Sequence, residues 1–251
     1  MGIKGKLQTV IVYMKNVEGK VRKACEIYSL IDDGDRITIG VSGGKDSFAL
    51  LYALNEFSKY SPKRFSLTVA VVDPVFNNQY TDYSAIELFC SDNGIPLSIR
   101  RSNLAQIVFD TRREKNPCSL CARMRRGILH DMTIEAGCRK IALGHHMNDA
   151  VETLFLNLFH QSRLESIKPL TYLSRKDITM IRPLLLCEEG EIISYMTSLN
   201  LNVVKSSCPM EGNSERDEVK RFIKEQENRY SGFVKNTFCA MQRGNISGLG
   251  L

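Results

Sequence analysis

An apolar stretch, RITIGV at residues 36–41, runs directly into the glycine pair Gly43 and Gly44, and a second apolar stretch follows at 47–57. The first stretch is short and rich in β-branched residues, which predicts a strand, whereas the second predicts a helix. Glycines between them let the backbone adopt conformations that a Cβ atom would hinder. This succession predicts an α/β fold in which a helix N-terminus lies at the end of a strand.

The alternation of strand and helix continues along the chain. The nearly continuous apolar character of residues 65–73 predicts a strand that is covered on both faces. Residues 95–102 and 139–146 predict two further strands. Other expected elements are helices at 84–94, 148–161 and 188–200, a strand within 179–187, and a polar helix that begins near Ser214. The pattern favours a parallel sheet with helices on both faces.

Length and composition fit one large domain with appended helices. The chain has 251 residues, of which 43% are hydrophobic, enough for one sizeable core. We expect an N-terminal helical segment at 1–30, a central α/β domain at 31–212 and a C-terminal helical segment at 213–251. No apolar run reaches the roughly 18 residues of a membrane span, and the N-terminus lacks the pattern of a signal peptide. We therefore expect a cytoplasmic protein that does not use a membrane.

The turn between the first strand and helix, SGGKDS at 42–47, has the chemistry of an anion site. Free backbone N–H groups at a helix N-terminus attract anions. Ser42 and Ser47 add hydroxyl donors, and Lys45 adds a positive charge. The alternative is a plain glycine turn that binds nothing.

A Walker A loop fits this turn poorly. That motif requires four residues between its glycines and a serine or threonine after its lysine. Here Gly40 and Gly44 enclose three residues, and Asp46 follows the lysine. The usual loop for transfer of a γ-phosphate is therefore not expected.

Two of the eight cysteines, Cys118 and Cys121, stand two residues apart in NPCSLCARMRRGIL. Such a pair can be a redox disulfide, half of a zinc site or part of an iron–sulfur site. The sequence holds no second C-x-x-C or C-x-x-H motif to complete a structural zinc site, and the pair lies too late for a thioredoxin motif. Cys208, beside a proline, is a candidate third ligand. The remaining cysteines are expected in the core at Cys25, Cys90, Cys138 and Cys187, and in a late helix at Cys239.

The string S-G-G-x-D-S resembles the loop of the PP-loop ATP pyrophosphatases, which grips the leaving pyrophosphate while a substrate is adenylated. The resemblance implies ATP and Mg²⁺ as cofactors, with Asp46 helping to hold magnesium. VAVVDP at 69–74 and ALGHHMNDAVETLF at 142–155 resemble further segments of that family, although His146 and Asn148 could simply cap the following helix. The implied nucleotide contacts are Ser42, Gly43, Gly44, Lys45, Asp46, Ser47, Val72, Asp73, Gly144, His145 and Asp149.

With its cysteines included, the chain resembles the TtcA family of tRNA 2-thiocytidine synthetases from about Ile37 to Arg221. The motifs are SGGKDS, CSLCxRxRRGIL, GHHxxDxxxTLFLNxF, IRPL and a lone CP. The resemblance implies that Cys118, Cys121 and Cys208 hold a 4Fe-4S cluster with one iron not bound by cysteine. These cysteines, Lys45 and Asp46 would then be the catalytic residues. The resemblance does not extend to residues 77–83 or 222–251.

The implied reaction is ATP-dependent thiolation of tRNA. ATP would adenylate the C2 oxygen of a cytidine in the anticodon region, and sulfur would then replace it. The base would have to leave its stack to be reached. The implied partners are tRNA and a sulfur donor such as a cysteine desulfurase or free sulfide, and the protein could be a homodimer.

A net charge of +6 and a group of basic residues near the cysteines favour a polyanionic partner. On a helix, Arg123 and Arg126 would share a face, whereas Arg125 would project elsewhere. Arginine suits RNA phosphates and base stacking, although local pairing with Glu114 or Asp131 is an alternative. The other basic residues of this group are Arg100, Arg101, Arg112, Arg113 and Lys115.

Four rival functions remain. A PP-loop enzyme could thiolate tRNA uridine, but such enzymes usually carry zinc ribbons, and a lysidine-type ligase would lack the three cysteines. A related enzyme could act on a small sulfur-containing or nucleobase substrate. The rival from another class is a non-catalytic ATP-binding or RNA-binding module with a structural metal, against which the intact SGGKDS argues.

Overall fold

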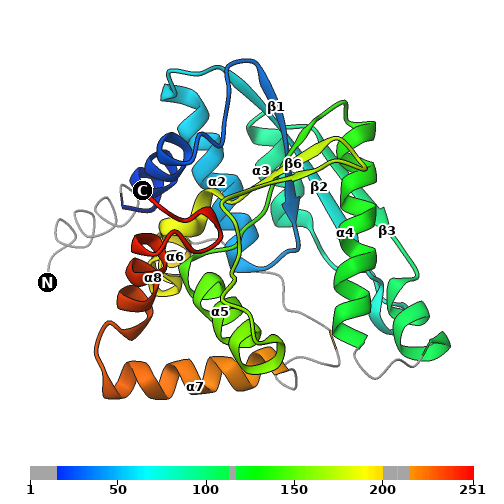
Figure 1. Ribbon diagram of the computed structural model, residues 1–251. Coiled ribbons are helices and arrows are strands. Elements are labelled where there is room, and N and C mark those ends of the chain that lie inside the picture. The colour runs from blue at the N-terminus through cyan, green and yellow to red at the C-terminus, as the bar shows by residue number, and fades with distance from the viewer. Residues whose placement is uncertain (1–15, 113–116, 200–207, 209–214) are drawn as a thin grey trace, which may run out of the picture.

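The computed structural model describes residues 16–112, 117–199, 208 and 215–251, and its centre is a six-stranded sheet (Figure 1). The strand order is β3-β2-β1-β4-β6-β5, and every neighbouring pair is parallel except β5 and β6. The strands are β1 (Asp35–Val41), β2 (Phe65–Asp73), β3 (Leu97–Arg101), β4 (Lys140–Ala142), β5 (Leu170–Leu173) and β6 (Ile178–Ile181). The predicted α/β class with a mostly parallel sheet is confirmed.

Helices cover both faces of this sheet. A helix at residues 16–27 precedes β1. The others are α2 (Lys45–Tyr60), α3 (Ser84–Asp92), α4 (Pro117–Glu135), α5 (Met147–Gln161), α6 (Glu189–Ser198), α7 (Glu215–Arg229) and α8 (Phe233–Arg243). None of the helices in the described ranges is long and apolar enough to cross a membrane.

The central strand β2 shows why its sequence is continuously apolar. Val69 and Val71 pack into the main core with side chains of α2, whereas Ala70 and Val72 pack on the opposite face with Met132 of α4. Figure 1 shows α4 and α2 on opposite sides of the sheet. Because alternate side chains of a strand point to opposite faces, both sets must be apolar when both faces are covered.

The strands after β3 differ from the prediction. β4 ends at Ala142, because the chain at Gly144 turns to pack against the backbone at the start of α2. Of the expected strand within 179–187, only residues 179–181 belong to β6, which begins at Ile178. Pro183, which has no N–H to donate, begins a 3₁₀ turn instead. β5 was not predicted, since it is a short edge strand whose side chains are alternately exposed.

The N-terminal and C-terminal helical segments pack on the central fold. The helix at 16–27 contributes Val17 and Val21 to the main core, and α7 and α8 form a second apolar cluster with α5. The boundaries at 30 and 212 stay a prediction. Residues 1–15 and the predicted helix start at Ser214 lie outside the described residues.

The order of the strands creates a switch point in the sheet. β2 and β3 follow on one side of β1, and β4 lies on its other side. Ligands of open α/β sheets bind outside the carboxyl ends of the strands at such a point. The SGGKDS turn leaves β1 there, and the segment from Leu143 to Met147 leaves β4 beside it.

Candidate active site

The turn at residues 42–47 is a closed loop that opens α2. Gly43 has a φ of +87°, a conformation that favours glycine. The hydroxyl of Ser47 donates to the Gly44 carbonyl over 2.9 Å and accepts from the Ser42 amide over 3.1 Å. Gly44 is the N-cap of α2 and brings no capping side chain, so the first amides of α2 are presented to a ligand. The loop is therefore built as an anion site.

Lys45 and Asp46 place opposite charges beside this loop. The Lys45 ammonium lies 2.8 Å from Glu189 Oε1 and 3.2 Å from Asp46 Oδ2. Burial disfavours its charge, but the bonds to Glu189 and Asp46 outweigh burial and raise the pKa of Lys45 above its ordinary value. Burial likewise disfavours the Glu189 anion, yet the Lys45 ammonium holds the pKa of Glu189 below its ordinary value. Lys45 is therefore charged at neutral pH.

The other carboxylate oxygen of Asp46 is suited to a cation. Oδ1 is buried and has no hydrogen-bond donor among the described residues, and His146 Nε2 is 3.7 Å away. A buried carboxylate oxygen without a partner is costly. Mg²⁺ is usually held by one or two carboxylates together with substrate phosphates, so Asp46 beside an anion loop fits that ion.

The segment after β4 approaches the loop closely. A Cβ atom on Gly144 would lie 2.9 Å from the backbone carbon and oxygen of Asp46. His145 Nδ1 is buried without a partner in the described chain, and burial lowers the pKa of His145, which favours the neutral ring. Asp149 Oδ2 accepts from the His146 amide over 3.0 Å. Burial opposes the Asp149 anion, but His146 and His145 keep the pKa of Asp149 below its ordinary value.

Asn148 does not cap its own helix. Its Oδ1 accepts from the amide of Glu189, the first residue of α6, over 2.9 Å. His146, by contrast, is the N-cap of α5. The predicted capping role therefore holds for His146, and Asn148 ties α5 to α6 instead.

A small cavity of about 270 Å³ lies between the phosphate loop and the segment after β4. Seven of the predicted nucleotide contacts line it, namely Ser42, Asp46, Ser47, Val72, Gly144, His145 and Asp149. Asp73 lines neither this cavity nor its larger neighbour. Asp73 is fully buried, and its carboxylate accepts from the Val75 amide and from the amide and hydroxyl of Thr81.

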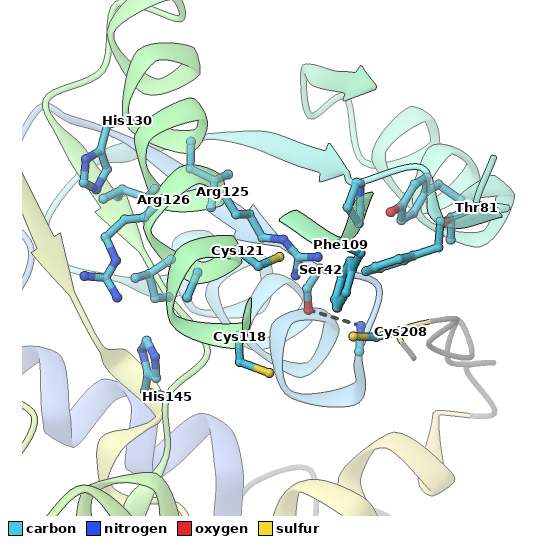
Figure 2. A pocket seen from close by; sticks show the side chains of 18 residues that line it. Ser42, Thr81, Phe109, Cys118, Cys121, Arg125, Arg126, His130, His145 and Cys208 are labelled. Atoms are coloured by element: carbon cyan, nitrogen blue, oxygen red, sulfur yellow. Dashed lines mark hydrogen bonds between the residues drawn. The ribbon is translucent and has the colours of Figure 1, made fainter. Parts of the chain in front are cut away.

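The larger cavity, of about 470 Å³, brings the three predicted cluster ligands together (Figure 2). Cys118 and Cys121 lie on α4, and Cys208 comes from the segment between α6 and α7. Ser42 and Gly44 of the phosphate loop line the same cavity. Ser42 and His145 also line the small cavity, so the two spaces adjoin.

Burial and neighbouring cysteines raise the pKa values of the Cys118 and Cys121 thiols. Burial raises the pKa of the Cys118 thiol first, and the charges of Cys208 and Cys121 raise it further. Burial also raises the pKa of Cys121, against the lowering effect of the Arg125 guanidinium. Three soft sulfur donors around one cavity fit a thiophilic metal group. In the described ranges, no three His, Cys, Asp or Glu side chains are gathered closely enough to hold a metal ion as they stand.

The five remaining cysteines lie away from the two cavities. Cys25, Cys90, Cys138 and Cys187 are buried in the core, as predicted, whereas Cys239 is partly exposed on α8. Burial raises the pKa of Cys187 to about 12, which makes it an inert thiol.

Arg125 and Arg126 line the larger cavity and Arg123 does not, although Arg125 was expected to project away from the face of Arg123 and Arg126. Arg100 pairs with Glu135, and Asp131 pairs with Lys176 rather than with an arginine. Arg113, Glu114 and Lys115 lie outside the described residues.

The cavity residues that were not singled out from the sequence include Phe76, Thr81, Tyr83 and Phe109. Phe76, Thr81 and Tyr83 follow β2, and Phe109 lies in a π-helical turn at Gln106–Thr111. The apolar run at 107–109 was the available signal in the sequence. These side chains form the cavity wall that faces α4.

A glycine-rich anion loop at the switch point of a parallel sheet, with a facing glycine after β4, defines a PP-loop nucleotide-binding protein. A family model described as the PP-loop domain matches residues 14–227. The chain belongs to the tRNA-cytidine(32) 2-sulfurtransferase family. It is 36% identical to the member from Syntrophotalea carbinolica, over 80% of this chain and 78% of that protein. The member from Geobacter sulfurreducens is 33% identical, over 92% of this chain and 90% of that protein.

A solved structure is also similar over most of the chain. It is the U34-tRNA thiolase NcsA from Methanococcus maripaludis with its 4Fe-4S cluster. The TM-score is 0.75 and the sequences are 28% identical, over 92% of this chain and 78% of that one. The described fold is therefore shared with a thiolase that holds an iron–sulfur cluster.

Proposed function

We propose that this protein is an ATP-dependent sulfurtransferase that replaces the C2 oxygen of cytidine 32 in tRNA with sulfur. The observation that carries the proposal is the larger cavity, which Ser42 and Gly44 of the phosphate loop share with Cys118, Cys121 and Cys208. An activated base and a sulfur source must meet at one carbon atom, and this cavity adjoins both sites. The family membership supports the same reaction.

The phosphate loop would serve the first half of the reaction. The first amides of α2, Ser42, Ser47 and Lys45 bind the phosphates, and Asp46 holds Mg²⁺ against them. The C2 oxygen of the base attacks the α-phosphorus of ATP, and pyrophosphate leaves. The products of this half are pyrophosphate and a base that carries AMP on its former C2 oxygen.

Sulfur replaces that oxygen in the second half. A hydrosulfide-level sulfur atom adds at C2, and AMP leaves with the original oxygen. A 4Fe-4S cluster held by Cys118, Cys121 and Cys208 would present sulfur at an iron that no cysteine binds. Arg125, which lines both cavities, lies where it can balance negative charge on the phosphate and on sulfur.

The RNA partner accounts for the basic character of the site. Arg125 and Arg126 open onto the larger cavity, and the chain carries a net charge of +6. Binding of tRNA should weaken with salt, with a log–log slope of about 0.9 for each duplex phosphate neutralised and about 0.7 for single strands. The proposal includes a cytoplasmic location, a sulfur donor such as a cysteine desulfurase or free sulfide, and a homodimeric state.

A second candidate is thiolation of a tRNA uridine. It is favoured by the likeness to NcsA, which is named as a U34-tRNA thiolase. The two candidates share the ATP chemistry and differ only in the base that enters the cavity.

Anaerobically reconstituted protein with ATP, Mg²⁺, sulfide and an unmodified tRNA transcript tests the proposal. Mass spectrometry of the digested nucleosides should detect 2-thiocytidine, with AMP and pyrophosphate formed in equal amounts. Asp46→Ala should form neither product. Formation of 2-thiouridine alone would select the second candidate, and AMP release at the normal rate by Asp46→Ala would refute the phosphate-loop assignment.

A further inference from the structure

The larger cavity has a wall to which the proposed reaction assigns no task. Figure 2 shows Phe109 and Thr81 across the cavity from α4, and the side chains of Cys121 and Arg125 project from α4 toward them. Phe76 and Tyr83 line the same side. We call Phe76, Thr81, Tyr83 and Phe109 the aromatic wall.

The backbone behind the aromatic wall is held in a strained conformation. Val75 has a φ of +53°, which is unusual for a β-branched residue. The fully buried carboxylate of Asp73 fixes this bend by accepting from the Val75 amide over 3.0 Å and from the Thr81 amide over 3.1 Å. The Thr81 hydroxyl donates to the same carboxylate over 3.2 Å. Asp73 thus sets the position of Phe76 and Thr81 at the cavity.

The rings of Phe76 and Phe109 are tilted against each other rather than stacked. Their ring centroids are 6.1 Å apart, and their planes are inclined by 55°. Phe76 is buried, and Phe109 is only partly buried on its π-helical turn. Because the two rings are inclined rather than stacked, neither ring covers a full face of the other.

We propose that Phe76 and Phe109 form the subsite that receives the splayed-out target pyrimidine, with Phe109 supplying the stacking face. This inference rests on the proposed function. Unpaired bases of RNA are commonly held by stacking on aromatic side chains. The target C2 atom must lie within reach of both the α-phosphate and the sulfur source, and a base in the larger cavity would face the phosphate loop and the cysteines together.

The adjoining small cavity is the better site for the nucleotide. Gly144, Asp149 and Val72 line it and do not line the larger one. At about 470 Å³ the larger cavity falls within the range of about 300–1,000 Å³ that is usual for ligand sites. Adenine and the target base therefore occupy neighbouring spaces that meet at Ser42 and Arg125.

A fluorescent cytosine analogue tests this subsite. The probe is an anticodon stem-loop RNA with pyrrolocytosine at the target position, bound to the full-length, cluster-loaded protein. Stacking on Phe109 should quench its fluorescence. Phe109→Leu should lose the quenching and raise the KM for tRNA about 10-fold, while the Kd for ATP stays within twofold. Phe109→Tyr should restore quenching, because it restores an aromatic face.

Phe159→Leu is the matched control, since Phe159 is an exposed aromatic on α5 away from both cavities. It should leave quenching and KM unchanged. Quenching that persists in Phe109→Leu, or a wild-type protein that binds the RNA without quenching, would overturn the subsite. A loss of ATP binding in Phe109→Leu would also overturn it by placing adenine on the ring.

The quenching measurement needs no turnover, so it separates the two proposals. A protein that quenches the probe but forms no thiolated base would keep the subsite and refute the proposed function. A protein that thiolates normally in the Phe109→Leu form would keep the function and refute the subsite. If Phe109→Leu melts well below the wild type, Phe109→Tyr and Phe76→Leu provide the comparison.

Discussion

The ammonium of Lys45 lies 2.8 Å from Oε1 of Glu189, so the phosphate loop is tied to the first residue of α6. The amide of Glu189 is in turn bound by Oδ1 of Asn148 on α5. Three helices that begin near the switch point are thereby linked through one carboxylate residue. The position of Lys45 is consequently set by α5 and α6 as well as by its own loop.

Glu189→Gln should slow ATP cleavage by acting through Lys45. A neutral amide holds an ammonium less firmly than a carboxylate does, so Lys45 should lose its fixed position beside the phosphates. We expect tRNA-dependent pyrophosphate release to fall about 10-fold. Lys45→Ala should fall further, and the double variant should be no slower than Lys45→Ala alone, because coupled residues are not additive. Additive losses in a pyrophosphate assay would show that Glu189 acts independently.

Gly144→Ala should displace the phosphate loop. The added methyl group would lie 2.9 Å from the backbone of Asp46, which no real Cβ contact tolerates. Overpacking of this kind typically costs about 1–3 kcal/mol, and we expect the Kd for ATP to rise at least 10-fold by calorimetry. Gly19→Ala is the control, because its Cβ would meet nothing within 4 Å. Equal ATP affinity in the two variants would contradict the close approach.

The three cavity cysteines should behave as a unit. Replacing Cys118, Cys121 or Cys208 with Ala should abolish both the proposed 4Fe-4S cluster and thiolation. Cys187→Ala should retain both, since Cys187 is fully buried in the core. Iron and labile-sulfide analysis after anaerobic purification provides the measurement. One zinc per chain without sulfide, or thiolation by Cys208→Ala, would contradict the ligand set.

Glu152 should make stability depend on pH. The pKa of this carboxyl is raised to about 7 from an ordinary 4.5, chiefly by burial and also by the nearby Asp149 and Glu189, against the lowering effect of Lys220 and Arg216. The folded state therefore keeps a proton that the unfolded chain releases near pH 4.5, so the stabilisation present below that pH is lost as the pH rises through 7.

Glu152→Gln cannot lose this proton. The free energy of unfolding of the wild type, relative to Glu152→Gln, should fall by up to about 3 kcal/mol between pH 4.5 and 8, since one pKa unit is about 1.36 kcal/mol. Urea titrations at several pH values provide the measurement. A difference that does not change with pH would show that Glu152 is already ionised throughout this range.

The sequence predicts the front half of the fold well, because each of its strands has a strong signal. The predicted strands at 36–41 and 65–73 match β1 and β2 within one residue. β5 was not predicted, because an edge strand needs apolar side chains on one face only and its four residues are too few to show a clear alternation. β4 proved shorter than predicted, since the close approach at Gly144 depends on contacts between distant segments.

The sequence motifs predict the phosphate loop and the cysteine ligands better than they predict the other residues that line the two cavities. The structure brings Cys208 to the same cavity as Cys118, as predicted. Asp73 was expected to contact the nucleotide, yet its carboxylate accepts hydrogen bonds from the following loop. Two of the three donors, the amides of Val75 and Thr81, are backbone groups that carry no sequence signature. The aromatic wall was missed for a similar reason: Phe76 and Phe109 meet only in the folded chain.

The placement of the cysteines has a consequence for folding. Cys118 and Cys121 precede β4, whereas Cys208 follows α6. A group bound by all three closes a loop that contains β4, α5, β5, β6 and α6, and so acts on the unfolded chain as a cross-link does. Oxidative loss of that group would remove the constraint from this half of the sheet and leave β1, β2 and β3 outside its reach. After oxygen damage, proteolysis would then begin in the part of the chain from β4 to α6.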